Sequence, residues 1–579
     1  STYQTLEYKT ASSDWTSMST STNITLDNIG DKVYVRGLLS RDNTYDNYTK
    51  FKMTGKISSS GNCNALWNYN DLNAPLRQYC GRDMFFGCTS LTTAPELPAT
   101  TLASDCYENM FHDCTSLTTA PELPATTLAG WCYGYMFWNC TSLTTAPSIL
   151  PATTLESYCY CGMFYGCTSL TQAPALPATT LADDCYKYMF QGCTSLTQAP
   201  ELPATTLVDD CYKYMFNDCT SLTTAPELPA TTLAGNCYSS MFYNCIGLTQ
   251  APELPATTLA NYCYRDMFNG CTSLTQAPEL PATTLANYCY DNMFRDCTSL
   301  TTTPELQATT LAEYCYNSMF YGCTSLTQAP ELPATTLVNG CYNQMFKGCS
   351  NLNYIKCLAT DIISAYNRTN SWVNGVSATG TFVKDVNSSW TVGDSGIPEG
   401  WIVEEVINAV TFTAEESGST IGLISLSSNQ TLEYKTASSD WTSMSTSTNI
   451  TLNNIGDKVY VRGMLSEDNT YSNNTQFTMT GKINASGNCN ALWNYSDLDA
   501  PLKKYCGFCM FKGCTSLTTA PELPATTLAD SCYGNMFYNC TGLTQAPELP
   551  ATTLAYSCYN GMFYGCTSLT IAPELPATT

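Results

Sequence analysis

The chain of 579 residues has few charged side chains, and most of these are acidic. Charged residues make up 12% of the sequence, and 48 Asp and Glu against 24 Lys and Arg give a formal net charge of −24. This shortage of cations argues against nucleic acid or an anionic membrane surface as a partner, because both need clustered Lys and Arg. No run of 18 apolar residues occurs, so the sequence predicts no membrane span.

Histidine is almost missing, since His112 is the only one in the chain. Ser-His-Asp triads, Cys-His pairs and histidine-bound metals are therefore excluded, and His112 is interpreted as a surface residue. The acidic residues form no convergent group in the sequence. We therefore predict no catalytic residue, no cofactor and no metal, and a protein that is not an enzyme.

Two weaker motifs have simpler interpretations. Cys506-x-x-Cys509 has the spacing of a redox or zinc motif, but no second CxxC accompanies it, so Cys509 is interpreted as an odd thiol, as is Cys161. The pairs Asp183–Asp184 and Asp209–Asp210 occupy equivalent places in successive repeats. They could approach a calcium ion, but a solvated acidic edge is the favoured interpretation.

One short repeat fills most of the chain, and its copy at 89–114 reads TSLTTAPELPATTLASDCYENMFHDC. Its second cysteine recurs from Cys88 to Cys349 at intervals of 26, with one interval of 27. Such a period predicts a solenoid, in which each repeat buries its apolar face against its neighbours. We expect Leu91, Ala94, Leu97 and Leu102 to point inward from a short parallel strand and its turn. Met110 and Phe111 are expected to point inward from a short helical turn.

A longer repeat, with a constant offset of 426, contains the first, since TLEYKTAS at 5–12 recurs at 431–438. Its leader has short strand-like runs typical of a small antiparallel β-sandwich. The first copy lacks the two opening runs found at 409–427. Either the chain is a window on a longer repetitive polypeptide, which we favour, or another subunit completes the sheet by strand addition. The predicted domains are an incomplete β-sandwich at 1–62, a capped solenoid at 63–357, a capping segment at 358–403, a β-sandwich at 404–488 and the start of a second solenoid at 489–579.

The 33 cysteines lie in register and allow two pairing schemes. Pairing within a repeat leaves three cysteines of the first array over, whereas pairing across repeats leaves only Cys161 and is slightly favoured. Such bridges would staple successive coils and would place the protein outside the cell. The alternative is reduced, buried cysteines that pack as small hydrophobes. The disulfide candidates are Cys63, Cys80, Cys88, Cys106, Cys114, Cys132, Cys140, Cys159, Cys349, Cys357, Cys489 and Cys506.

A tyrosine follows the first cysteine of most repeats and must form one column in a solenoid. The favoured interpretation is a half-buried packing ladder, and the alternative is an aromatic strip that binds glycans or protein. The residues that vary between repeats lie at 103–105, 108–109 and 112–113 and their counterparts, where a specificity surface is expected. The candidate strip comprises Tyr107, Tyr133, Tyr186, Tyr212, Tyr238, Tyr264, Tyr290, Tyr316 and Tyr342.

The repeat CTSLTxAPELPATTLxxxCYxxMFxG resembles the BspA-like leucine-rich repeat. Met-Phe stands where that family has Ala-Phe, and Leu-x-x-Ala-Pro-x-Leu-Pro stands where it has Leu-x-x-Ile-x-Ile-Pro. Cys-Tyr replaces Ile-Gly, which adds the second cysteine column and departs from the family's usual turn. The resemblance implies a secreted or surface-attached protein of gut Bacteroidota or their phages, often an adhesin, with no catalytic residues to carry over.

The leading functional hypothesis is an extracellular structural and adhesive surface protein. Its tandem modules, one for each copy of the longer repeat, would form an elongated, disulfide-stapled fibre. Its partners would be other copies of itself, with host glycan or matrix protein as further candidates. The alternative is a glycan- or protein-binding module that uses the tyrosine column. An enzyme is the third hypothesis, and it lacks the acid pairs it would need.

Overall fold

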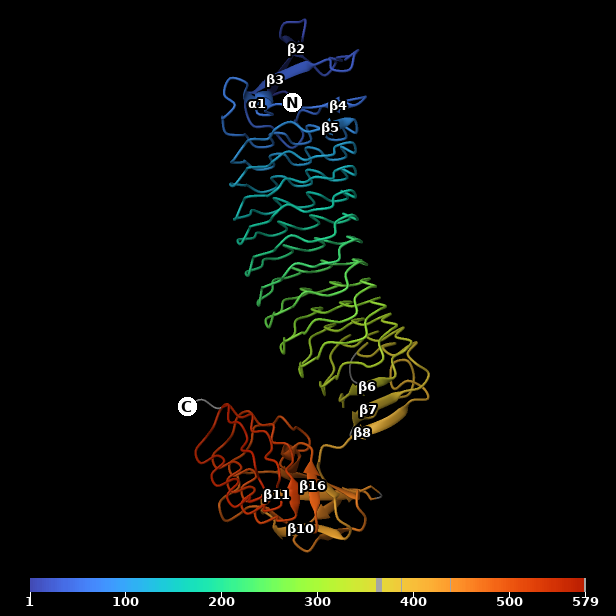
Figure 1. The fold of residues 1–579 in the computed structure, drawn as a ribbon, viewed down its shortest axis with the longest axis vertical. Coiled ribbons are helices and arrows are strands. Elements are labelled where there is room, and N and C mark those ends of the chain that lie inside the picture. The colour runs from blue at the N-terminus through green and yellow to red at the C-terminus, as the bar shows by residue number, and fades with distance from the viewer. Residues whose placement is uncertain (361–366, 387, 438, 577–579) are drawn as a thin grey trace. The chain divides into compact units, whose positions relative to one another are not determined.

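The computed structural model describes residues 1–360, 367–386, 388–437 and 439–576. The chain divides into two compact units, Ser1–Glu405 and Val406–Thr579. Each unit starts with a leader rich in strands and continues into stacked coils, where one coil is the turn of chain made by one repeat (Figure 1).

The leader of the first unit holds a small antiparallel sheet with the order β2-β1-β3, and helix α1 packs against β3. Strand β4 pairs in parallel with β5 and so joins the leader to the first coil. At the other end of the stack, a sheet with the order β6-β7-β8 covers the last coil. The elements are β1 (Gln4–Thr10), β2 (Thr16–Met18), β3 (Val33–Leu39), β4 (Ile57–Ser58), α1 (Ala65–Asn68), β5 (Leu91–Thr93), β6 (Tyr354–Cys357), β7 (Thr381–Asp385) and β8 (Ile402–Val406).

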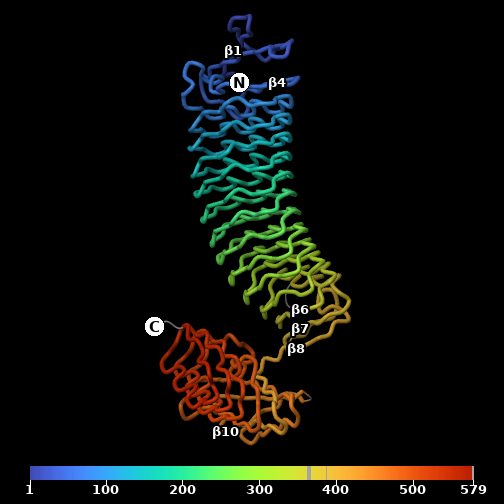
Figure 2. The backbone as a smooth tube through the Cα atoms, viewed as in Figure 1, coloured from blue at the N-terminus to red at the C-terminus, as the bar shows by residue number. Residues whose placement is uncertain are grey.

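Between β5 and β6 the chain winds through stacked coils, which Figure 2 shows as successive rungs. The predicted stacked repeat is confirmed, but its strands are shorter than expected. Adjacent coils pair through single parallel bridges, such as Thr119 with Thr145 and Thr127 with Thr101, rather than through named strands. The prolines of each APELP segment explain this, because they lack the amide hydrogen that a longer ladder needs.

The helical turn predicted for each repeat is wrong, since the two helices among the described residues, α1 and η1 (Cys489–Leu492), both precede the coils of their arrays. Instead, alternate amides of the segment make two kinds of bond. The amide of Met110 closes a turn on the carbonyl of Tyr107 (3.2 Å), whereas that of Phe111 donates to Met136 in the next coil (2.9 Å). Left-handed residues produce this alternation, as at Asp105 (φ 59°). In a helix these amides would donate to carbonyls of the same coil, and the neighbouring coil would receive no hydrogen bonds from them.

The core consists of columns in which one residue type repeats from coil to coil. The predicted inward residues Leu97, Met110 and Phe111 are at most 1% exposed, and their counterparts along the array are buried too. Phenylalanine rings stack in one such column, with 5.5 Å between the centroids of Phe111 and Phe137. Ala94 is only partly buried at the margin of this core.

The leader of the second unit forms two sheets that share one core with the following coils. The larger sheet has the order β12-β11-β14-β9-β16-β17 and the smaller the order β13-β10-β15. The larger sheet is mixed, because β16 pairs in parallel with β17 of the first coil. The elements are β9 (Val410–Ala414), β10 (Ser419–Ser425), β11 (Gln430–Thr436), β12 (Thr442–Met444), β13 (Asn449–Leu452), β14 (Lys458–Leu465), β15 (Gln476–Thr480), β16 (Ile483–Ser486), η1 (Cys489–Leu492) and β17 (Leu517–Thr519).

All 33 cysteines lie within the described residues, and all carry free thiols. The thiol of Cys114 donates to the carbonyl of Phe85 (3.1 Å), and that of Cys140 donates to Phe111 in the same way (3.1 Å). A hydrogen bond between coils thus replaces the expected covalent staple. The correction applies to every predicted bridge, which involved Cys63, Cys80, Cys88, Cys106, Cys114, Cys132, Cys140, Cys159, Cys349, Cys357, Cys489 and Cys506.

The neighbours of the thiols within the array, such as Cys106, explain why successive repeats form neither pairing scheme. Burial raises the pKa of Cys106, and the thiols that raise it further are Cys80 and Cys132. Both belong to the same column as Cys106, one repeat away on either side. The partners proposed from the spacing, Cys88 and Cys114, lie in a separate column.

We predict that the native chain resists thiol reagents. Its cysteines are buried, apart from the half-buried Cys558, and burial opposes formation of the thiolate. A hydrogen bond from Cys506 lowers the pKa of Cys532, but Cys532 is fully buried. Maleimide labelling should therefore be slow in buffer and should reach all 33 cysteines in denaturant without a reductant. A shortfall that is removed by reductant would show that disulfides are present.

Candidate functional site

The nine tyrosines of the candidate binding strip are at most 2% exposed. Their rings stack inside the array, as with Tyr186 and Tyr212, whose centroids lie 5.7 Å apart. A buried column cannot present its faces to a ligand, so the binding strip predicted at these positions is wrong and the packing interpretation holds. The column is also more deeply buried than the half-buried ladder that we expected.

A second set of aromatic residues lies at the surface, at the variable positions of the repeat. The aromatic face is defined within residues 115–323. It consists of the Trp and Tyr residues with positive φ that lie directly before the first cysteine of a repeat or three residues after that cysteine. They are half-buried. The aromatic face comprises Trp131, Tyr135, Tyr158, Tyr188, Tyr214, Tyr262, Tyr288 and Tyr314.

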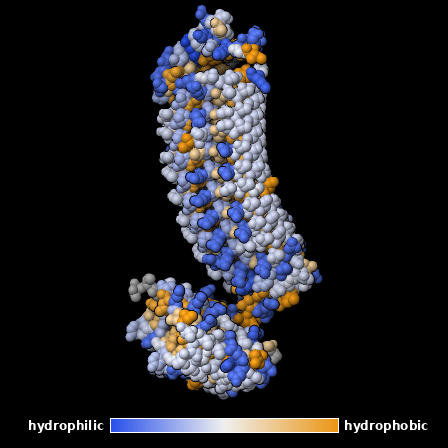
Figure 3. All heavy atoms as spheres, in the orientation of Figure 1, coloured by the Kyte–Doolittle hydropathy of each residue, from blue (hydrophilic) through white to orange (hydrophobic). Residues whose placement is uncertain are grey.

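Stacking between coils orders these rings. Tyr262, Tyr288 and Tyr314 form a continuous ladder with 4.7 Å between successive centroids. Trp131 and Tyr158 form a second group at 4.2 Å and 2° between ring planes. Figure 3 shows strongly hydrophilic and hydrophobic residues in columns along the first unit, on a surface that is otherwise intermediate in hydropathy.

An ion-pair ladder separates the two aromatic groups. Lys187 lies 2.6 Å from Asp184 and 3.2 Å from Asp210, and Lys213 lies 3.2 Å from Asp210. Burial lowers the pKa of Lys187, but hydrogen bonds and attraction from both carboxylates outweigh this effect and leave the pKa raised. Ammonium groups therefore occupy the place that calcium would take. No group of three metal-ligating side chains occurs among the described residues.

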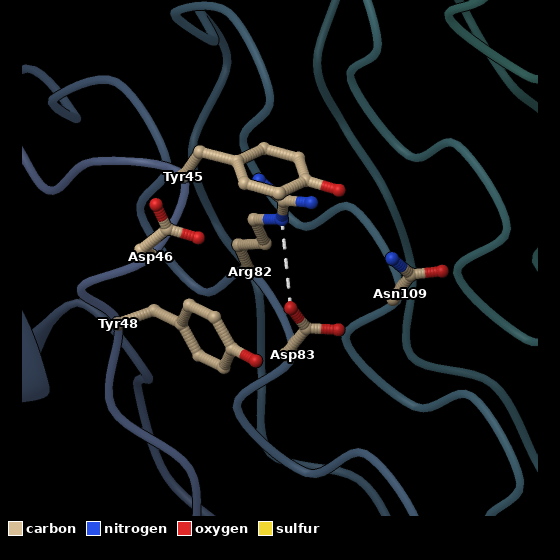
Figure 4. Close-up of a pocket in the computed structure, with 6 residues that line it drawn as sticks. All are labelled: Tyr45, Asp46, Tyr48, Arg82, Asp83 and Asn109. Atoms are coloured by element: carbon tan, nitrogen blue, oxygen red, sulfur yellow. Dashed lines mark ion pairs between the residues drawn. The ribbon is translucent and has the colours of Figure 1, made fainter.

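A polar pocket of about 380 Å³ lies at the leader end of the same columns (Figure 4). The ring of Tyr45 covers the guanidinium of Arg82 at 4.0 Å, and Asp83 lies 3.5 Å from the Arg82 Nε. Asp46 and Tyr48 of the leader form the other wall, and Asn109 of the next coil completes the lining, so leader and coils build the pocket together. The lining residues are Tyr45, Asp46, Tyr48, Arg82, Asp83 and Asn109.

Arg82 and Glu108 are both buried, with 6% and 7% of their surface exposed. The Arg82 Nε lies 3.1 Å from a carboxylate oxygen of Glu108. The Arg82 Nη1 has no hydrogen-bond partner among the described residues. Burial raises the pKa of Glu108 to about 7, although the charge of Arg82 opposes the shift. A buried donor without an acceptor is costly, which marks this pocket as a place where a ligand could supply one.

The second unit has different residues at the positions that correspond to this pocket. At the offset of the longer repeat, Phe508 and Cys509 stand where the first unit has Arg82 and Asp83. Tyr471 packs on Phe508 at 5.4 Å, so an apolar contact replaces the cation–π contact. Cys509 occupies a left-handed position with φ 57°, and it belongs to no metal-ligating group of the described residues.

The two remaining residues that the sequence singled out, His112 and Cys161, contact side chains of adjacent coils. His112 stacks against Trp138 at 5.4 Å, and burial lowers its pKa. The thiol of Cys161 donates to the hydroxyl of Tyr135 (3.4 Å). Both contacts are packing contacts between adjacent coils.

Comparison with known proteins identifies the family of the repeat. A family model described as the BspA type leucine rich repeat region matches residues 63–173, 134–275, 235–368 and 491–573, more than half of the chain. Among solved structures, a leucine-rich repeat protein from Bacteroides ovatus ATCC 8483 aligns over 66% of this chain and 97% of its own, with 15% identity and a TM-score of 0.28. No curated protein matches the chain significantly. Of the described residues, no helix is long and apolar enough to cross a membrane.

We predict that Tyr133→Phe leaves the free energy of unfolding unchanged or raises it by up to about 1 kcal/mol, because the buried hydroxyl has no described hydrogen-bond partner. Tyr133→Ala should lower it by about 3–5 kcal/mol, since the ring fills a column of the core. Denaturant unfolding of both variants measures this. A clear loss for Tyr133→Phe would show that the hydroxyl is bonded.

A second prediction concerns pH. The folded chain holds the Glu108 proton up to about pH 7, whereas the ordinary value is 4.5, so folding binds a proton between these values. The contribution of Glu108 to stability therefore falls as the pH rises through this window, by up to about 3 kcal/mol. Glu108→Gln should remove that part of the pH dependence when the unfolding free energies are compared at about pH 4 and about pH 8. Identical pH profiles for the two proteins would contradict the assignment.

Proposed function

The chain belongs to the BspA-type leucine-rich repeat family, and from this premise we propose that it is an extracellular, cell-surface protein that binds a partner through its aromatic face. Leucine-rich repeat proteins of this kind are typically structural or binding proteins rather than enzymes, and they are often surface-associated and adhesin-like. The proposal extends this description to one surface of this chain.

The observation that carries the proposal is the presence of large aromatic residues at left-handed positions. Tyr262, Tyr288 and Tyr314 have φ between 54° and 60°. Other coils place Asp, Asn or Gly at the same column, as at Asp184 and Gly340, and these residues adopt this conformation at lower cost. Since a tyrosine there gains no buried core position, we attribute it to contact with a partner.

The chemistry of the face suits a glycan or a protein surface. Stacked rings supply rigid contact area at low entropic cost. Beside Tyr262, Arg265 pairs with Asp266 and Asp291 at 3.2 Å each, and burial raises the pKa of Asp291 to about 6. These polar groups can fix the orientation of hydroxyl or amide groups on the ligand. The net charge of −24 favours neutral or cationic partners over polyanions.

A second candidate function is a fibre of tandem modules, supported by the recurrence of leader and array in the longer repeat. In this proposal β-sandwich leaders at 1–62 and 404–488 alternate with repeat arrays at 63–357 and 489–579, and 358–403 caps the first array. The coils would be held by backbone hydrogen bonds and buried columns, because the cysteines are free. The two functions are compatible, since a fibre displays a binding face.

The binding proposal predicts that replacing Tyr262, Tyr288 and Tyr314 together by Ser lowers affinity on the order of 100-fold or more, because aromatic anchors dominate such contacts. Binding of the full chain to immobilised oligosaccharides and to immobilised matrix proteins would first identify a ligand, and the variant would then be compared with the parent. The triple Tyr→Phe variant should keep most of the affinity, since it keeps the stacked rings.

The matched control replaces Glu253, Glu279 and Glu305 by Gln in exposed positions outside the aromatic face of the same coils. It should bind as the parent does. Equal affinity of the Ser variant and this control, with both folded by circular dichroism, would rule out the aromatic face as the binding surface.

A further inference from the structure

The polar pocket at the leader end of the array is lined by groups that need opposite hydrogen-bond partners. Arg82 can only donate, it is 6% exposed, and its Nη1 atom has no hydrogen-bond partner among the described residues. Asp46 and Asp83 line the same pocket, and an ionised carboxylate can only accept. A molecule that satisfies this pocket must therefore accept a hydrogen bond at one point and donate at another.

Backbone hydrogen bonds hold the two sides of the pocket together. The amide of Asp83 donates to the carbonyl of Glu108 in the next coil (3.0 Å). In the leader, the amide of Phe51 donates to the carbonyl of Met84 in the first coil (2.7 Å). Asp83 and Asn109 occupy the same place in successive coils, and both have φ 52°. The lining is thus ordered without a ligand, which lowers the entropic cost of binding one.

The ring of Tyr45 covers the Arg82 guanidinium at 4.0 Å, as Figure 4 shows. Tyr45 is 65% exposed, so little packing holds its ring, and exposed side chains change rotamer rapidly. Such a movement would open Nη1 of Arg82 to a ligand. The position is equally open in a leader with more strands, since its counterpart Tyr471 is 74% exposed in the second unit, where β9 and β10 are also present.

The charge of the lining narrows the class of ligand. One cation, Arg82, is accompanied by two carboxylates, Asp46 and Asp83, so an anionic ligand would be repelled. A cationic ligand could bind the carboxylates but would leave Arg82 without an acceptor. A neutral molecule with several hydroxyl groups meets both needs, because each hydroxyl both donates and accepts. The volume of about 380 Å³ lies within the range of small-molecule sites.

We propose that this pocket is a binding site for a small neutral saccharide, whose hydroxyl groups would donate to Asp46 and Asp83 and accept from Arg82. The half-buried ring of Tyr48 supplies an apolar surface beside these groups for the C–H face of a sugar. The site is separate from the aromatic face, since none of its lining residues belongs to that face. It does not depend on whether the aromatic face binds a partner.

The second unit shows that the fold accepts a version of this place without the charges. The pairs that correspond at the offset of the longer repeat are Arg82 and Phe508, Asp83 and Cys509, and Glu108 and Gly534. A Cβ atom added at Gly534 would lie 2.9 Å from the ring of Phe508, so the glycine has to accompany the phenylalanine. Exchanging all three residues therefore reproduces a set that the turn segments already accommodate, and it does not leave Glu108 buried without Arg82.

The test uses the full chain and the methyl glycosides of glucose, galactose, mannose and N-acetylglucosamine, with the methyl glycoside of glucuronic acid as the charged comparison. Saturation-transfer NMR should detect binding of at least one neutral glycoside, and titration should show that the glucuronide binds more weakly. The variant with Arg82→Phe, Asp83→Cys and Glu108→Gly should bind that neutral glycoside at least about tenfold more weakly, because hydrogen bonds to charged groups are lost. Binding of none of the neutral glycosides, or tighter binding of the glucuronide, would overturn the proposal.

Two single variants keep the test independent of the fold of that triple variant. Asp46 and Asp14 are both exposed in the leader, but only Asp46 lines the pocket. Asp46→Ala should weaken binding at least about threefold, whereas Asp14→Ala should bind as the parent does. Parental affinity in Asp46→Ala, or in the triple variant when circular dichroism shows it folded, would overturn the assignment.

The aromatic face provides the last control. The variant that replaces Tyr262, Tyr288 and Tyr314 by Ser keeps the pocket, so it should bind the neutral glycoside as the parent does. Loss of glycoside binding in that variant would place the site on the aromatic face and overturn the assignment to the pocket. A failure of the pocket is thereby distinguished from a failure of the aromatic face.

Discussion

Hydrogen bonds between the turn segments of successive coils are the interaction on which this structure depends. Each segment uses half of its amides to close its own turns and the other half to reach the next coil, as Met110 and Phe111 do. This alternation requires left-handed residues at regular places, and it puts equivalent residues of all coils in register. The columns of Leu, Met, Phe, Tyr and Cys follow from that register, because a residue can only pack against its own counterpart above and below. Removing the backbone alternation would remove the core with it.

The same geometry separates constant positions from variable ones. Residues that point inward meet identical neighbours, so a change in one coil disturbs two others. Half-buried left-handed residues at the surface, such as Asn236 and Tyr262, contact solvent and their column neighbours, and they vary between coils. A binding surface can therefore change without loss of the fold at these positions, whereas the buried tyrosine column cannot take that role. This division explains why near-identical repeats are compatible with a specific partner.

The sequence was sufficient for the repeat, the family resemblance and the inward residues Leu97, Met110 and Phe111, because burial in a solenoid follows from period and hydrophobicity. It was insufficient for the turn segment, since helical spacing and alternating left-handed turns both place Met-Phe inward. A signal was present in the residue directly before the second cysteine, where the coils have Gly, Asp or Asn, as at Asp113 and Gly166. These residues favour positive φ and indicate turns rather than helix.

Two other features could not be predicted from the sequence, for different physical reasons. The aromatic face was missed because a regular Tyr column is the stronger sequence signal. Most of the variable positions lie at the surface as expected, but Glu108 is buried. Cysteine spacing could not decide between bridges and thiols, because it does not show that the two cysteines of a repeat stack in separate columns. Comparison of the two copies then shows which parts of the module are constrained. The two leaders keep much of their sequence, as in NITL at 23–26 and 449–452. In contrast, Arg82 and Asp83 of the polar pocket become Phe508 and Cys509, and the cation–π contact of Tyr45 becomes the ring contact of Tyr471. The apolar version shows that the fold does not need the buried charges, which are costly to desolvate, so their presence in the first unit points to a role beyond packing. Sequence is thus retained in the leader strands and differs at the pocket, which is the pattern expected of a repeated scaffold whose copies present different surfaces.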